Sequence, residues 1–221
     1  MKKKLFVLVA LLACITTANA QWYVGGSFGF TSTTIDDGNS DESGSSFKIV
    51  PDIGYQVDSK MSVGLQIGYS HGLATFGSLT VTDVKQAMST VLGAYADINN
   101  EDMKLNGFTI SPYIRYNVVE FGRANLFIEG YIGYNNITTD STPNIGSDDD
   151  SYGGDKAKIN AFELGVRPGI SFQVSDKLDL LCKMGAIGYM SAKEKESDGS
   201  VSRFGMNADT YNLLFGVNFH F

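Results

Sequence analysis

The chain is poor in the residues that most often form cross-links or carry chemistry. It has two cysteines, two histidines and four prolines among 221 residues. Cys14 falls in the N-terminal segment described below, which leaves Cys182 without a partner for an intramolecular disulfide. His71 and His220 alone leave little scope for histidine-dependent acid–base chemistry. The sequence therefore predicts no enzyme activity, no bound metal and no cofactor.

Positive charge and long apolar runs are also scarce. The sequence has 17 basic and 24 acidic residues, so its formal net charge is −7, which argues against nucleic-acid binding. Beyond residue 20 no run of 18 apolar residues occurs, so no transmembrane helix is expected. Glycine and aromatic residues are abundant instead, with 25 Gly, 14 Phe, 11 Tyr and 1 Trp. This composition favours many strands joined by polar loops.

The first 20 residues have the layout of a secretory signal peptide. Lysines at positions 2–4 precede an apolar run that ends at Cys14, and Ala18-Asn-Ala20 fits the small-x-small cleavage pattern. We expect cleavage near Ala20, which leaves residues 21–221 as one domain. In an alternative interpretation, Leu11-Leu-Ala-Cys14 approximates a lipobox and Cys14 is lipidated.

Eight segments after residue 20 alternate apolar with polar or small residues at the period of a β-strand. They cover residues 22–30, 47–57, 61–71, 108–118, 125–135, 162–174, 178–190 and 211–221. Strands that cross a membrane need roughly 9–11 residues with the apolar side facing lipid. The fold predicted is all-β: a single transmembrane antiparallel up-and-down β-barrel of eight strands. Two additional strands hidden in residues 72–107 would give ten.

Connection lengths and aromatic positions support the barrel. Short turns at residues 58–60, 119–124 and 175–177 alternate with long polar loops at 31–46, 72–107, 136–161 and 191–210, as in barrels with short periplasmic turns and four long surface loops. Aromatic residues gather near both predicted interfaces. The periplasmic set is Trp22, Tyr55, Tyr116, Phe172 and Phe221, and the outer set is Phe30, Phe47, Tyr69, Phe108, Tyr134, Phe162 and Tyr211. The strands of a soluble, secreted β-sandwich would also alternate apolar with polar residues, but that fold would not require two girdles of aromatic residues.

Eight charged residues fall on the inward face of the predicted strands. They are Lys48, Asp52, Arg115, Glu129, Glu163, Arg167, Asp179 and Lys183. Four are basic and four acidic, which suggests a paired network, since unpaired buried charges are costly. Arg115 and Glu129 lie on consecutive strands and could pair directly. We expect a polar interior filled by side chains; a conducting pore or proton path is the alternative.

The alternating C-terminal strand with its ending Phe219-His-Phe221 is similar to the closing strand of small outer-membrane β-barrels. The chain resembles outer membrane proteins of the A and X type, and more specifically the outer membrane protein beta-barrel domain proteins often called porin family. The resemblance implies a bacterial outer-membrane location, an assembly signal at Phe219 and Phe221, and contact with outer-membrane lipid, lipopolysaccharide and the barrel-assembly machinery. It implies activity only weakly.

The resemblance suggests a structural or adhesion-type protein that acts through its acidic surface loops. Alternatives are a narrow porin or small-solute transporter, and a lipid A-modifying enzyme that uses His71. Acidic clusters at Asp36, Asp37, Asp41 and Glu42 and at residues 148–150 and 155 could bind divalent cations, but their spacing matches no calcium loop. In the second loop, helical spacing predicts a short amphipathic helix within residues 82–97, capped by Thr80 or Thr82.

Overall fold

The computed structural model describes residues 21–36, 41–72, 74–80, 82–84, 86, 105–139, 158–194, 200–208 and 212–221. The predicted signal peptide, the lipobox at Cys14 and the acidic residues 148–150 and 155 lie outside these residues. The same holds for most of the helix predicted within residues 82–97.

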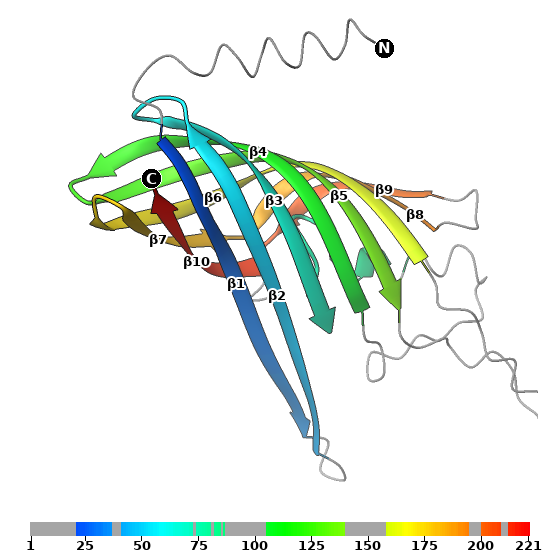
Figure 1. The fold of residues 1–221 in the computed structure, drawn as a ribbon. Helices are drawn as coiled ribbons and strands as arrows, with labels where there is room; N and C mark the ends of the chain where they lie inside the picture. The colour runs from blue at the N-terminus through cyan, green and yellow to red at the C-terminus, as the bar shows by residue number, and fades with distance from the viewer. Residues whose placement is uncertain are drawn as a thin grey trace, which may run out of the picture.

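In the described part of the chain, ten antiparallel strands form one closed sheet (Figure 1). They are β1 (Gln21–Asp36), β2 (Asp41–Gln56), β3 (Met61–Gly72), β4 (Leu105–Phe121), β5 (Ala124–Thr139), β6 (Lys158–Ser175), β7 (Leu178–Met184), β8 (Ala186–Glu194), β9 (Ser200–Asn207) and β10 (Leu213–His220). Neighbours in sequence pair from β1 to β6, and β10 pairs with both β7 and β1, which closes the barrel.

The ten strands occupy eight positions in the barrel wall. Strands β7 and β8 both pair with β6 and follow one line, interrupted at Gly185, where φ is +63°. Strands β9 and β10 continue one another in the same way, because β9 pairs with β8 and β10 pairs with β7. The eight-stranded prediction is therefore confirmed. Within residues 72–107, the described part between β3 and β4 contains no additional strand.

Several strands run further than the alternation predicted. Strands β1 and β2 stay paired to Asp36 and Asp41, so most of the loop predicted at residues 31–46 is an extended hairpin. Likewise, β9 lies inside the loop predicted at 191–210. Outside the bilayer a strand no longer needs an apolar face, so its sequence loses the alternation while its ladder continues. Figure 1 shows the β1–β2 hairpin extending past the ends of the neighbouring strands.

The wall has an open seam in its outer half. Strand β1 pairs with β10 only as far as Phe28, opposite Phe215. Within the described residues, β9 pairs with β8 and with no other strand. Among the described residues, the edges of β1 beyond Phe28 and of β9 therefore have no ladder partner, while the ladder of the periplasmic half of the barrel is continuous.

The outward face of the barrel is apolar. Large side chains such as Val24, Ile53, Ile114, Leu164 and Val217 are each more than 40% exposed, which in this fold means contact with lipid. The register places outer aromatic residues side by side, with Phe30 opposite Phe47, Tyr69 opposite Phe108 and Tyr134 opposite Phe162. The helices found among the described residues are too short or too polar to cross a membrane.

Candidate functional site: a filled barrel interior

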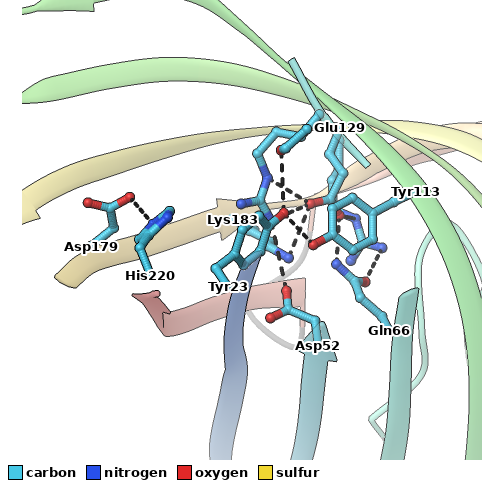
Figure 2. Close-up of polar contacts among 11 residues, drawn as sticks. Tyr23, Asp52, Gln66, Tyr113, Glu129, Asp179, Lys183 and His220 are labelled. Atoms are coloured by element: carbon cyan, nitrogen blue, oxygen red, sulfur yellow. Dashed lines mark hydrogen bonds and ion pairs between the residues drawn. The ribbon is translucent and has the colours of Figure 1, made fainter. Parts of the chain in front are cut away.

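A buried carboxylate lies at the centre of the barrel. Glu129 on β5 is fully buried and makes ion pairs with three cations, Arg115, Arg167 and Lys183, at 2.8, 3.1 and 3.3 Å. Gln66 donates a further hydrogen bond to Glu129 Oε1 at 3.0 Å. These residues come from β3, β4, β5, β6 and β7, so the cluster ties together strands around the barrel (Figure 2). The Arg115–Glu129 contact joins the hairpin partners that the sequence analysis considered.

Aromatic rings and a second carboxylate complete this cluster. The Arg115 guanidinium lies 4.7 Å from the centre of the Phe127 ring, and that of Arg167 lies 4.4 Å from the Tyr131 ring. Asp52 Oδ2 is 3.9 Å from Arg115 Nη2. Around Glu129 the described cluster thus has three cations and two carboxylates, an excess of one positive charge. Stacking on aromatic faces and ion pairing together stabilise cations that are removed from water.

The structure divides the eight predicted interior charges among three places. Five of them meet in the central cluster: Asp52, Arg115, Glu129, Arg167 and Lys183. Asp179 lies apart, at the periplasmic end, where its Oδ2 is 2.9 Å from His220 Nε2 (Figure 2). Lys48 and Glu163 lie toward the outer mouth, and each has a partner in a segment that the sequence analysis placed in a surface loop.

The chain that follows β3 turns into the mouth of the barrel. We call the described residues 74–80 and 82–84 of this segment the plug. Thr75, Phe76, Ser78, Leu79 and Val84 are buried, and Leu79 and Val84 have no exposed surface. The barrel interior is therefore filled at two levels: the charge cluster in the middle and the plug above it.

Polar side chains from the wall hold the plug. Lys48 Nζ donates to the backbone oxygen of Thr75 at 2.7 Å and to Asn212 Oδ1 at 2.8 Å. Glu163 Oε1 accepts hydrogen bonds from the Leu79 amide and the Ser78 hydroxyl at 2.8 and 3.1 Å. Both charges are 1% exposed, so these bonds form away from bulk water.

Strand β9 holds the plug from the other side of the seam. Arg203 donates to both carboxylate oxygens of Asp83 at 2.8 Å and to the Ser78 carbonyl at 2.6 Å. Asn207 donates to the Leu79 carbonyl at 3.0 Å. Since Lys48 lies on β2 and Arg203 on β9, the plug bridges the two sides of the open wall.

An apolar lining receives the plug. Leu79 and Val84 pack in one buried cluster with inward side chains from the outer ends of β4, β5, β6 and β8. The wall residues are Leu105, Ile137, Ile159, Ala161, Met190 and Ala192, with Val201 of β9 packed against them. Apolar residues in the inward phase of four strands were a signal in the sequence, because such a face requires an apolar occupant. The sequence analysis missed it, and with it Asp83, Arg203, Asn207 and Asn212.

The end of the plug begins a helical turn. The Thr80 hydroxyl accepts a hydrogen bond from the Asp83 amide at 3.2 Å, and Asp83 Oδ2 accepts one from the Thr80 amide at 2.8 Å. This reciprocal pair is a capping arrangement, and residues 82–84 are helical. Thr80, one of the two caps predicted, is thus the cap that the structure shows.

The two histidines have other partners. His71 Nδ1 is 2.8 Å from Asn106 Oδ1, and its ring lies 5.7 Å from that of Phe47 at the outer girdle. His220 and Asp179 line a polar cavity of about 350 Å³ at the periplasmic mouth. Within the described residues no group of three or more His, Cys, Asp or Glu side chains is arranged to hold a metal ion.

The family model of the outer membrane protein beta-barrel domain matches residues 5–221, nearly the whole chain. The chain belongs to this family. Membership places this outer-membrane barrel in the bacterial outer membrane. Cleavage near Ala20 and the assembly role of Phe219 and Phe221 stay predictions.

Solved structures with a similar fold are small outer-membrane barrels. Neisserial surface protein A is 13% identical, covers 92% of this chain and 100% of its own, and gives a TM-score of 0.49. A major outer membrane protein from Thermus thermophilus is 14% identical, with coverages of 92% and 100% and a TM-score of 0.46. The N-terminal barrel of Pseudomonas aeruginosa OprF is 13% identical, with coverages of 90% and 97% and a TM-score of 0.45. No curated protein sequence matches this outer-membrane barrel.

Proposed function

We propose that this protein is an occluded barrel that anchors contact segments at the cell surface. The observation that supports this proposal is the filled interior. Glu129 and its cations close the middle of the barrel, and the plug closes the mouth above them. With both levels occupied by described residues, we expect that solutes do not pass and that the protein acts through what it presents outside.

The β1–β2 hairpin is the clearest contact segment among the described residues. It continues for six residue pairs beyond the girdle pair Phe30–Phe47, from Thr31–Ser46 to Asp36–Asp41. Its sequence there is rich in hydroxyl and carboxylate residues and contains no basic residue. An acidic projection favours a partner with a basic surface, because complementary charge speeds encounter and selects the partner.

The test is adhesion of cells that display the protein. Cells with the wild-type protein should bind a surface coated with a basic protein such as lysozyme and should not bind a heparin-coated surface. Replacing Asp36, Asp41 and Glu42 with Asn, Asn and Gln should abolish the difference. A matched control replaces Asp58, Glu120 and Asp176 in the periplasmic turns. Equal binding by wild-type and hairpin variant would refute the proposal.

A narrow channel is the second candidate, and the charge excess of the central cluster favours it. Arg115, Arg167 and Lys183 would attract anions if the plug moved, and the cavity at the periplasmic mouth reaches Arg115. Conductance of the refolded protein in a planar bilayer distinguishes the two candidates. Absence of discrete openings supports the occluded barrel. Anion-selective openings that change when Lys183 is replaced with Gln support the channel.

A further inference from the structure

The barrel wall has a groove on its lipid-facing side. It has a volume of about 640 Å³ and is lined mainly by outward side chains of β5, β6, β8 and β9. These are Ile132, Leu164, Val166, Ile187, Tyr189 and Phe204. The volume lies within the roughly 300–1,000 Å³ of ligand sites. Because the lining faces lipid, its natural occupant is an acyl chain.

Gly130 gives the groove its depth. A side chain added there would meet only Ile114, at 3.5 Å or more, so the space outside Gly130 is open. The register places Ile114 and Val166 on either side of Gly130, and both project outward. A missing side chain between two large ones leaves a slot in the apolar surface.

The groove ends at the free edge of β9. Phe204 on this strand is 75% exposed and Met206 is 66% exposed. Phe204 lies opposite Tyr189, which itself lies opposite Leu164. The row from β5 to β9 is thus a continuous apolar strip that stops at the open seam.

Above the groove the same face changes from apolar to polar and then to basic. On β6 the outward residues run from Leu164 through Phe162 and Asn160 to Lys158. On β8 they run from Tyr189 through Ser191 to Lys193, and the Ser202 hydroxyl of β9 donates to that of Ser191 at 3.0 Å. Lys193 lies opposite Asn160, which puts Lys158 one diagonal step away, within roughly 7–8 Å between backbones.

This gradient is specific to one side of the barrel. Within the part of the chain that the structure describes, Lys158 and Lys193 are the only basic side chains on the outward face above the outer girdle. The sequence of the β1–β2 hairpin beyond Phe30 and Phe47 contains hydroxyl and carboxylate residues and no basic residue. In a chain of net charge −7, two adjacent lysines above an apolar groove form a local site for negative charge.

We propose that this groove binds a phosphorylated lipid of the outer leaflet, with an acyl chain along Leu164, Ile187 and Phe204 and the anionic headgroup at Lys158 and Lys193. The order of chemistry along the wall matches the order within such a lipid: apolar chain, polar linkage and phosphate. The binding site is independent of the proposed surface contacts, since it lies on the lipid-facing wall of the barrel.

The test uses the refolded chain in detergent micelles and bis-phosphorylated lipid A as the probe, with adducts measured by native mass spectrometry. The double variant Lys158→Gln/Lys193→Gln should bind lipid A roughly 10- to 30-fold more weakly, since each lysine near a charged lipid surface contributes a factor of about three to five. The control Lys60→Gln/Lys177→Gln removes the same charge from the periplasmic turns and should bind like the wild type. Gel mobility with and without heating verifies that each variant is folded.

A second variant tests the groove itself. Gly130→Leu fills the slot and should weaken binding about tenfold without changing any charge, whereas Val217→Leu on β10, away from the groove, should not. The affinity of the wild type for dephosphorylated lipid A should be no higher than the affinity of Lys158→Gln/Lys193→Gln for bis-phosphorylated lipid A. Equal binding of both lipids, or full binding by Gly130→Leu, would overturn the proposal. The proposal would also be overturned if the wild type formed a dimer without bound lipid and Gly130→Leu converted it to a monomer. A second copy of the chain would then cover the groove.

Discussion

Glu163 Oε1 accepts a hydrogen bond from the backbone amide of Leu79 at 2.8 Å, across 84 positions of sequence. A buried wall carboxylate thus binds the main chain of the plug. Two strands along the wall, Arg203 on β9 binds the Asp83 side chain and the Ser78 carbonyl. The plug is therefore held by charge-assisted bonds from β6 and β9, and the closed state of the mouth depends on them.

Removal of these two anchors should open the mouth. We expect Glu163→Ala/Arg203→Ala to speed hydrogen exchange at the Leu79 and Asp83 amides relative to the wild type, because each loss leaves plug groups without a partner. Glu120→Ala/Arg123→Ala, at an exposed periplasmic turn, removes the same charges and should behave like the wild type. If the anchor variant folds and keeps the wild-type exchange rates, the Lys48 bond and the apolar lining suffice to hold the plug.

Gly77 should not tolerate a side chain. Its φ is +59°, and an added Cβ would collide with Glu163 Oε2 and lie 2.5 Å from the Tyr131 hydroxyl. Gly122 is the matched control, since its φ is +63° but nothing lies within 4 Å of an added Cβ. Gly122→Ala should cost only the backbone strain, about 1–2 kcal/mol.

Gly77→Ala should cost more and should also loosen the plug. The readout is hydrogen exchange at the Leu79 amide, which should speed up in Gly77→Ala and stay unchanged in Gly122→Ala. Equal protection of this amide in both variants would show that the turn at Gly77 can move without loss of the Glu163 bond.

Glu129→Gln should destabilise the barrel strongly. The substitution keeps the shape of the side chain but leaves Arg115, Arg167 and Lys183 without their shared counter-charge. We expect the free energy of unfolding to fall by about 3–5 kcal/mol, measured by urea titration in micelles with Trp22 fluorescence. Adding Lys183→Met should recover part of the loss, because it removes one of the uncompensated cations.

The control for this prediction is the Asp179–His220 hydrogen bond at the periplasmic mouth. Asp179 and His220 keep 24% and 14% of their side-chain surface exposed. Asp179→Asn should therefore cost under about 1 kcal/mol. A loss for Glu129→Gln as small as this would mean that water reaches the central cluster and screens its charges.

Most outward residues of the strands could be predicted from the alternation, but Tyr55, predicted for the periplasmic girdle, is only 8% exposed and packs against Trp22. Tyr69, Phe108 and Ile132 lie outward as the alternation predicted. Side chains of a strand point alternately to its two faces, and only the apolar face can contact lipid. Strand ends were harder to predict. Thr31 to Asp36 lie above the membrane, where the lipid no longer imposes alternation, so the continuing ladder leaves no periodic signal.

The partners of the inward charges could be predicted only in part. Arg115 and Glu129 share a hairpin, and their pairing follows from local register. Arg167 lies directly opposite Glu129 on the next strand, β6, so this contact also follows from register once β5 and β6 are paired. Lys183 reaches the same carboxylate from β7, two strands away, which no local pattern encodes. The binding of Glu163 to Leu79 also required knowledge that a predicted surface loop turns inward.

The sequence alone determined the location, the barrel and most of the residues that face lipid. Each membrane-spanning strand must place apolar side chains at every second position, and this alternation is visible within a single segment of sequence. The tertiary structure decided what fills the barrel. Closure brings Asp83 to Arg203 and Leu79 to Glu163, and it leaves the seam between β1 and β9. These relationships depend on the shear and circumference of the closed sheet, which are properties of all the strands together.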